Sequence, residues 1–393
     1  MKTFAEIIAC LILMALAGCK HMQFIESPQP FEINYYDASL VGRLERLLVL
    51  NNLIICKFSE SGFFVIDTNN TRQPVAERKL NAYGGISFMQ VHRNKLFLLL
   101  ENHDIVILDS SFNRLPEAEA TFRSFRPGGL FIYNDSLFFY QKDEGYVYVS
   151  PEITLKKIKK DQFLKYHSYL IMAMGDPVFT DSSYQVYACS GFEGSGNLFF
   201  RDKRTSQTFS LPTSCFGEMV SFRGKYHLIQ AFGFASIFNT MDDPARFFPV
   251  HIENGADFCC GCDTASYYYQ HLQPEAQRLW DSSRGIKTYF EGRMHTVSTF
   301  QLEDNLYSIA LQDSSFMILE HDDSVRLIQS SARKEPRISE YHYAQKENGK
   351  GFHAIGLNGT YWQGGEPVNR LGLIIIKGRR IAIYESYSDG NVK

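Results

Sequence analysis

The sequence predicts an all-β fold built from repeated four-stranded units, and three observations support this prediction. Aromatic residues make up 14% of the chain, and aromatic side chains favour the half-buried faces of strands. Pairs of short apolar runs, separated by polar turns, recur at intervals of about 40 residues. No helical pattern alternates with these runs, which argues against a parallel α/β fold.

Each repeat has the same internal order of strands and turns. "NNLIICKFSESGFFVIDT", from Asn51, has a polar turn, an apolar strand, a second turn and a second apolar strand; "RNKLFLLLENHDIVILDS" from Arg93 and "NDSLFFYQKDEGYVYVSP" from Asn134 repeat it. A further strand precedes the first turn, as in "RLLVLNN", and a looser stretch such as "SSFNRLPEAEATF" follows. We therefore expect four strands per unit, joined by hairpin turns rich in Asn, Asp and Gly.

The repeats number seven and predict a β-propeller. Their opening positions are Leu53, Leu96, Leu137, Val186, Tyr226, Leu306 and Leu373. Four strands at this period are typical of a propeller blade, because stacked blades bury both faces of each sheet. We predict one propeller domain over residues 31–393 with seven blades. Six blades, or eight with a degenerate unit between Tyr226 and Leu306, are the alternatives.

Two segments add a resemblance to a known family. "FFVIDTNNTRQPV" (residues 63–75) and "SIFNTMDDPARFFPV" (residues 236–250) are similar to the repeats of bacterial surface propellers with an LVIVD-type, YncE-like motif. Those repeats run apolar strand, Asp, turn, Pro, and the other units of this chain lack the proline. The resemblance therefore implies the propeller class alone. Asp67 and Asp109, at strand ends, are expected to accept hydrogen bonds from turn amides.

The N-terminus predicts export and a lipid anchor. The apolar run over residues 7–17 is too short to span a bilayer comfortably and is typical of a signal peptide. It ends in "LAGC", which resembles the lipobox of bacterial lipoproteins. That resemblance implies removal of residues 1–18, acylation of Cys19 and a tether over residues 19–30. A plain signal peptide is the alternative.

Charge and motifs exclude several function classes. The net charge of −3 argues against nucleic acid as a partner, because phosphate binding needs clustered Lys and Arg. The one dense basic stretch, residues 155–165, is interpreted as a solvated face or an edge strand. The sequence has no P-loop, nucleophile elbow or HExxH motif. No catalytic residue and no cofactor is therefore assigned.

One segment, residues 253–293, interrupts the repeats and holds the candidate ligand-binding residues. It has a helix start at Pro274 and a run of tyrosines. Because long loops on rigid scaffolds carry function, we expect a binding surface there. The candidates are Tyr267, Tyr268, Tyr269, His271 and Trp280, together with Trp362 in a separate glycine-flanked turn. Packing of the tyrosines beneath the loop is the alternative.

The cysteines of this segment allow three interpretations. Cys259 and Cys262 have the spacing of half a zinc or iron–sulfur site, but a second pair at that spacing is missing from the sequence. A disulfide or free thiols are the alternatives, and no metal is assigned. Cys56 and Cys189 lie inside predicted strands and are expected to be core residues.

These features predict a lipid-anchored protein of the bacterial cell envelope, at the outer membrane or cell surface, that binds or scaffolds a protein or glycan partner. The alternative is a propeller hydrolase or lyase acting on a carbohydrate or lactone at the channel mouth, and a third hypothesis is a structural subunit of an envelope assembly. An enzyme predicts converging ionisable groups, at least one with a shifted pKa. A binding module predicts an exposed aromatic or apolar patch.

Overall fold

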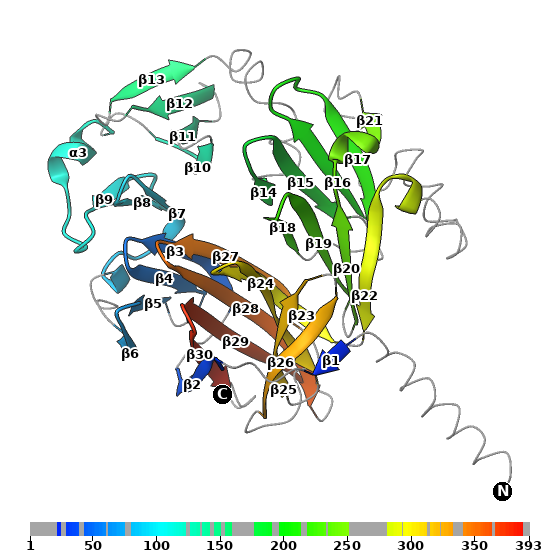
Figure 1. Cartoon of the computed structure of the whole chain (residues 1–393). Helices are drawn as coiled ribbons and strands as arrows, with labels where there is room; N and C mark the ends of the chain where they lie inside the picture. The colour runs from blue at the N-terminus through cyan, green and yellow to red at the C-terminus, as the bar shows by residue number, and fades with distance from the viewer. Residues whose placement is uncertain are drawn as a thin grey trace, which may run out of the picture. The chain divides into compact units, whose positions relative to one another are not determined.

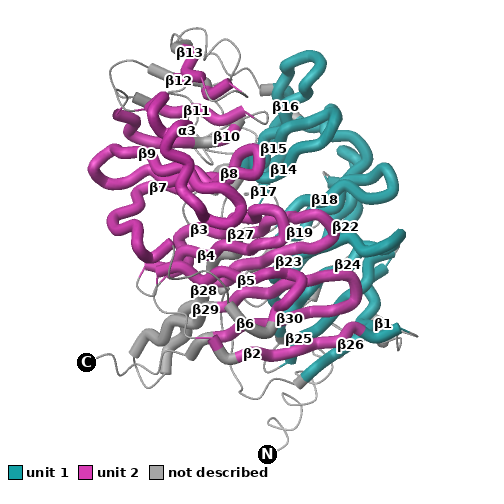
Figure 2. The backbone as a smooth tube through the Cα atoms, turned by 90° about the vertical axis from the view of Figure 1, so that its left-hand side faces the viewer, with its two compact units in different colours: residues 1–30, 169–341 teal, residues 31–168, 342–393 magenta. Residues whose placement is uncertain are grey.

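The protein is nearly all β in the computed structural model, and its described residues form two compact units. Unit 1 comprises residues 1–30 and 169–341, and unit 2 comprises residues 31–168 and 342–393 (Figure 2). The structure describes residues 22–24, 29–38, 43–59, 62–74, 80–122, 126–133, 136–141, 145–150, 154–158, 177–190, 196–213, 218–232, 235–250, 281–292, 294–312, 315–322, 324–332, 341–363 and 366–387. Among them, a helix with the length and apolar character of a membrane span is not found.

The described part of unit 2 contains four sheets (Figure 1). Sheet 1 has β3 (Leu44–Leu50), β4 (Leu53–Phe58), β5 (Gly62–Asp67) and β6 (Asn70–Pro74). Sheet 2 has β7 (Ile86–His92), β8 (Lys95–Leu100) and β9 (Ile105–Leu108). Sheet 3 has β10 (Gly129–Tyr133), β11 (Ser136–Gln141), β12 (Gly145–Val149) and β13 (Leu155–Ile158), so the basic stretch begins in an edge strand. Sheet 7 has β27 (Tyr341–Gly349), β28 (Phe352–Gln363), β29 (Glu366–Lys377), β30 (Arg380–Tyr387) and β2 (Glu32–Asp37), which runs parallel to β30.

The described part of unit 1 contains three sheets. Sheet 4 has β14 (Phe179–Thr180), β15 (Tyr184–Ser190), β16 (Gly196–Asp202), β17 (Thr208–Thr213) and β21 (Phe248–Val250). Sheet 5 has β18 (Glu218–Phe222), β19 (Lys225–Phe232), β20 (Ala235–Met241) and β22 (Ile286–Gly292). Sheet 6 has β23 (His295–Leu302), β24 (Asn305–Gln312), β25 (Ser315–His321), β26 (Val325–Ala332) and β1 (Met22–Phe24), which runs parallel to β26.

The seven sequence repeats correspond one to one to the seven sheets of the described residues. Six openings lie in the second strand of a sheet: β4, β8, β11, β15, β19 and β24. Leu373 lies instead in β29, the third strand of sheet 7, so the last repeat was placed one strand late. Between Tyr226 and Leu306 the described strands complete sheets 4 and 5 and begin sheet 6, and no eighth sheet occurs among them.

Tight hairpins connect the first and second strands of several sheets, as the turn residues predict. Arg93 and Asn94, between β7 and β8, have φ values of 49° and 57°. Arg223 and Gly224, between β18 and β19, have φ values of 49° and 73°. Positive φ at both central positions defines a type I′ turn, whose twist matches that of paired strands.

The sheets of unit 2 bury apolar side chains on both faces, which explains why their strands are continuous apolar runs. In β4, Ile54 and Cys56 pack in a cluster with Leu373 of sheet 7. The intervening Ile55 packs in a second cluster with Leu96 of sheet 2. Each buried aliphatic side chain of this size contributes about 1.5–3 kcal/mol. The prediction of Cys56 as a core residue is confirmed, because its thiol is free and fully buried.

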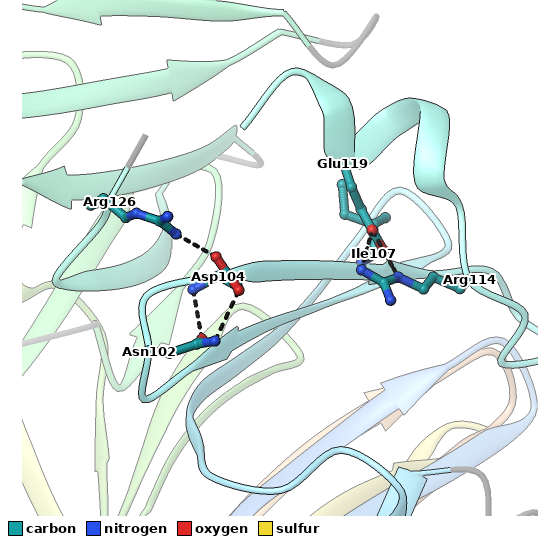
Figure 3. Close-up of polar contacts among 6 residues, drawn as sticks. All are labelled: Asn102, Asp104, Ile107, Arg114, Glu119 and Arg126. Carbon is teal, nitrogen blue, oxygen red and sulfur yellow. Dashed lines mark hydrogen bonds and ion pairs between the residues drawn. The ribbon is translucent and has the colours of Figure 1, made fainter. Parts of the chain in front are cut away.

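A short helix takes the place of the fourth strand in sheet 2. The stretch "SSFNRLPEAEATF" was expected to supply that strand, but it forms α3 (Pro116–Ala120), with proline at its start. The buried carboxylate of Glu119 accepts the N–H of Ile107 in β9 at 3.0 Å (Figure 3). It also accepts two bonds from Nε of Arg114, at 2.8 and 2.9 Å. The side chain thus satisfies a backbone donor that a fourth strand would otherwise pair.

A second polar contact joins sheet 2 to the segment before sheet 3. Asp104, in the β8–β9 turn, accepts from Asn102 Nδ2 at 2.9 Å and pairs with Arg126 (Figure 3). The side chains of Arg126 and Asp104 are 57% and 53% exposed. Exposed pairs of this kind contribute about 1 kcal/mol at most.

Replacing Glu119 by Ala is expected to lower the free energy of unfolding by about 2 kcal/mol, because a buried donor without an acceptor costs about 1–3 kcal/mol. Urea denaturation of the two proteins measures the change. Glu119→Gln retains an oxygen for the Ile107 N–H and is expected to cost less. Asp104→Ala, which removes only the exposed contacts with Asn102 and Arg126, is the control. An equal loss in both Ala variants would contradict the role of Glu119 as the acceptor for the Ile107 N–H.

Candidate functional site

Most of the sequence-predicted site residues lie outside the described residues. These are Cys19, Cys259, Cys262, Tyr267, Tyr268, Tyr269, His271 and Trp280, with the helix start at Pro274. The backbone of Trp362 lies in β28, where it pairs with Pro367 near the β28–β29 hairpin. The described part of the chain contains no group of three or more His, Cys, Asp or Glu residues arranged to hold a metal ion.

The strand-end aspartates stabilise turns, as predicted. Asp67 accepts the N–H of Asn69 at 2.8 Å. Asp109 accepts the N–H groups of Ser111 and Asn113, each at 2.8 Å. The Asp67 carboxylate therefore supports the β5–β6 hairpin, and the Asp109 carboxylate supports the turn between β9 and α3.

Polar side chains from three sheets of unit 2 come together on the first strands of those sheets. β3, β7 and β27 are each the edge strand that opens its sheet. Nη2 of Arg46 in β3 donates to Oε1 of Gln90 in β7 at 2.7 Å. Glu347 in β27 is close enough to Arg46 for the guanidinium to act on its ionisation. With Phe88 of β7, these residues are called the edge-strand group.

Glu347 has a shifted pKa. Burial raises the pKa of its carboxyl from 4.5 to about 7, and the nearby Arg46 opposes part of that rise. Near neutral pH the group is therefore divided between a carboxylate, which accepts hydrogen bonds, and a carboxylic acid, which also donates one. A desolvated acid beside a fixed cation is an arrangement found at binding and catalytic sites.

An exposed aromatic ring lies on the same strand as Gln90. Phe88 is 47% exposed, which is unusual for a ring of this size on a strand. Side chains two positions apart on a strand share a face, so Phe88 and Gln90 point the same way. A Cβ at Gly129, the first residue of β10, would lie 3.8 Å from the Phe88 ring. The group thus combines one open apolar face with an amide, a guanidinium and a carboxyl.

Sequence reasoning missed this group because its members are far apart in the chain. The only signal is weak: Arg46 interrupts the apolar run "LERLLVL", and Gln90 interrupts "ISFMQVH". Such interruptions also occur at ordinary solvent-facing positions of strands. Only the packing of successive sheets brings them to one place.

A second constellation, in unit 1, forms a chain of hydrogen bonds between sheets 5 and 6. His227 Nδ1 lies 3.2 Å from the Tyr289 hydroxyl, which lies 3.0 Å from Nδ1 of His321. Nε2 of His321 lies 2.6 Å from Oγ of Ser308, and that hydroxyl lies 3.0 Å from Oγ1 of Thr299. We call these residues the His–Tyr chain. A consistent direction of donation can run along the chain, either from His227 through Tyr289 and His321 to Ser308 or in reverse, depending on the tautomers of the two histidines.

The His–Tyr chain is a structural element rather than a nucleophilic site. Ser308 has an exposed fraction of 0% and His321 of 2%, so a substrate has no access to their pairing. Burial lowers the pKa of His321 to about 3 and that of His227 to about 4, and burial raises the pKa of the Tyr289 hydroxyl. All three groups are therefore neutral at physiological pH. Their bonds fix the register of two sheets whose apolar residues, including Phe238 and Leu319, pack in one cluster.

Comparisons with known proteins assign no family. No family model matches the chain. No curated protein matches it in sequence. Among solved structures, one from a study of two prolyl endopeptidases has a TM-score of 0.36 and 7% identity, covering 87% of this chain and 61% of that chain. This chain therefore spans about three fifths of that protein's length. A polysaccharide lyase structure has a TM-score of 0.28 and 10% identity, covering 91% of this chain and 95% of that chain.

Proposed function

We propose that this protein is a lipid-anchored, seven-bladed β-propeller of a bacterial cell envelope and that its edge-strand group binds a glycan. The anchor follows from the "LAGC" segment and Cys19. Seven sequence repeats and seven sheets of the described residues support the seven-bladed propeller. In a propeller the first strand of each blade lines the central channel, where ligands bind.

The observation that supports a glycan ligand is the exposed Phe88 ring beside the bonded pair of Arg46 and Gln90. A sugar ring presents an apolar C–H face that packs on an aromatic ring, together with hydroxyls that need donors and acceptors. The guanidinium supplies donors in a fixed orientation and Gln90 supplies both kinds of group. The pair already bonds at 2.7 Å, so the ligand meets a preorganised site.

Glu347 favours a second candidate function, a hydrolase or lyase acting on the bound glycan. A general acid or base works best when its pKa lies near the working pH. The pKa of Glu347, about 7, meets this condition. In this case Arg46 and Gln90 position the substrate and Glu347 exchanges the proton.

A glycan array of bacterial envelope polysaccharides and peptidoglycan fragments tests both candidates, followed by calorimetry on each ligand retained. Phe88→Ala and Arg46→Ala are each expected to weaken binding about tenfold, which corresponds to about 1.4 kcal/mol. Arg204→Ala, on the exposed β16–β17 turn, is the matched control and is expected to bind as the parent does.

The outcomes separate the two candidates. New reducing ends or unsaturated products, lost in Glu347→Gln while binding persists, indicate the enzyme. Binding without turnover indicates the binding module. The proposed site would be refuted if the protein bound no glycan on the array, or if Phe88→Ala bound the glycan as tightly as the parent does.

A further inference from the structure

The first described segment after Cys19 is fixed to the outer edge of sheet 6. β1 pairs in parallel with β26, and Met22, Gln23 and Phe24 lie opposite Val325, Arg326 and Leu327 (Figure 1). Because the two strands run in the same direction, the chain enters beside the start of β26. It therefore joins the sheet at the β25–β26 turn.

Very little chain separates this point from the proposed anchor. Lys20 and His21 alone lie between Cys19 and Met22. A fully extended residue spans at most about 3.6 Å, so the Cα atoms of Cys19 and Met22 are at most about 11 Å apart. The headgroup region of one leaflet is about 5–8 Å thick. A lipid on Cys19 thus brings one end of sheet 6 to the membrane surface.

The antiparallel order of sheet 6 determines which turns share that end. The β23–β24 turn and the β25–β26 turn lie at the end where β1 begins, and the β24–β25 turn lies at the opposite end. We call the end of sheet 6 that holds the β23–β24 and β25–β26 turns the near end. The eight residues of β24 separate the two ends by about 25 Å.

The side chains at the near end suit phospholipid headgroups rather than the hydrocarbon core. Glu303, Asp304, Asp322 and Ser324 are all exposed. Arg223, from the β18–β19 turn of sheet 5, donates to Asp322 at 3.3 Å and to the carbonyl of Asp304 at 2.8 Å. Carboxylates outnumber this arginine, so the surface fits a zwitterionic bilayer better than an anionic one.

We infer that the near end of sheet 6 is held against the headgroups of the bilayer in which Cys19 is anchored, so that the protein has a fixed orientation on the membrane. This inference rests on the proposed acylation of Cys19. A tether of this length leaves unit 1 little freedom to rotate, whereas a flexible linker of many residues would allow all orientations.

Energy transfer to labelled lipids tests the orientation. The full chain, purified after expression in a bacterium that processes lipoproteins, is reconstituted in phosphatidylcholine vesicles containing a headgroup-labelled acceptor. A fluorescent amino acid replaces Ser324 at the near end or, as the matched control, Ser315 at the opposite end. Transfer is expected to be severalfold more efficient from position 324. A Gly-Ser linker inserted between Lys20 and His21 is expected to remove most of this difference.

Two further measurements distinguish the possible failures. The anchor is established if the protein floats with vesicles and its N-terminal peptide is acylated, and if Cys19→Ala loses both properties. Without acylation, both the anchor and the orientation are refuted. With acylation, equal transfer from positions 324 and 315 before linker insertion refutes the orientation alone and leaves the proposed anchor standing.

Discussion

Between pH 7 and pH 5, the two histidines of the His–Tyr chain are expected to remove about 4 kcal/mol from the free energy of unfolding. An ordinary histidine has a pKa of 6.5, whereas burial lowers the pKa of His321 to about 3 and that of His227 to about 4. At pH 5 the unfolded chain therefore binds two protons that the folded protein does not. The stability is fully present above about pH 6.5 and is lost as the pH falls towards the folded pKa values.

Urea denaturation at pH 7 and pH 5 measures this effect by comparing the parent with His227→Gln/His321→Gln. Glutamine retains hydrogen-bonding groups but does not titrate. Every other group, including Glu347, titrates in both proteins, so subtraction of the two pH dependences isolates the histidines. Each single variant is expected to remove about half of the difference, because each shift is worth about 2 kcal/mol over this interval. Identical pH dependence in the parent and the double variant would show that the two histidines have the same pKa in the folded protein as in the unfolded chain, and would contradict the expectation.

Replacing Glu347 by Gln is expected to stabilise the protein by about 2–3 kcal/mol at pH 8 and to change little at pH 4. Burial raises the pKa of this carboxyl from 4.5 to about 7, so ionisation opposes folding. The protonated Glu347 carboxyl makes its full contribution to the free energy of unfolding below about pH 4.5, and this contribution is lost as the pH rises through 7. Glutamine has the shape of the protonated acid and avoids the charge at every pH.

Denaturation of Glu347→Gln at pH 4, 6 and 8 tests this expectation, with Glu45→Gln as the control. Glu45 is an exposed carboxylate on β3 that pairs with Lys57, and its loss is expected to change stability by less than about 1 kcal/mol. A Glu347→Gln protein that is less stable than the parent at pH 8 would mean that the electrostatic attraction of the Arg46 guanidinium for the Glu347 carboxylate outweighs its desolvation. A variant that is more stable but has lost its ligand would show the exchange of stability for function that is common at binding sites.

The prediction of an all-β chain divided into sheets of mostly four or five strands is confirmed for the described residues, because the signals for both features are local. Continuous apolar runs such as "LIIC" identify strands buried on both faces, and Asn, Asp and Gly mark the hairpins. The errors came where a local pattern was compatible with two structures. The stretch around α3 was read as a strand, although Pro116 and the alternating glutamates suit a helix start equally well. The last repeat is one strand late because β28 and β29 are both 12 residues long and the clearest apolar run, "LIII", lies in β29.

The N-terminal and loop predictions remain predictions. Cys19, the tyrosines of residues 267–269 and the cysteine pair all lie outside the described residues. Their assignment depends on motif and composition alone. If Cys19 is acylated as predicted, the lipid lies within three positions of β1, because Met22 already pairs with β26. The predicted anchor would therefore hold sheet 6 close to the membrane.

The sequence by itself determined that this chain forms hairpins, that the hairpins recur at intervals of about 40 residues as the sheets of the described residues do, and that each sheet needs an apolar partner on both faces. Hydrophobic periodicity and turn chemistry act within a few residues, so they are visible in a single sequence. Only the tertiary structure decided that Arg46, Phe88, Gln90 and Glu347 form one group, and that the His–Tyr chain links sheets 5 and 6. Those contacts depend on which strand faces lie against each other in the folded protein. The pKa shifts depend on how much water the packed sheets exclude from each ionisable group, and a local stretch of sequence carries no signal for that exclusion.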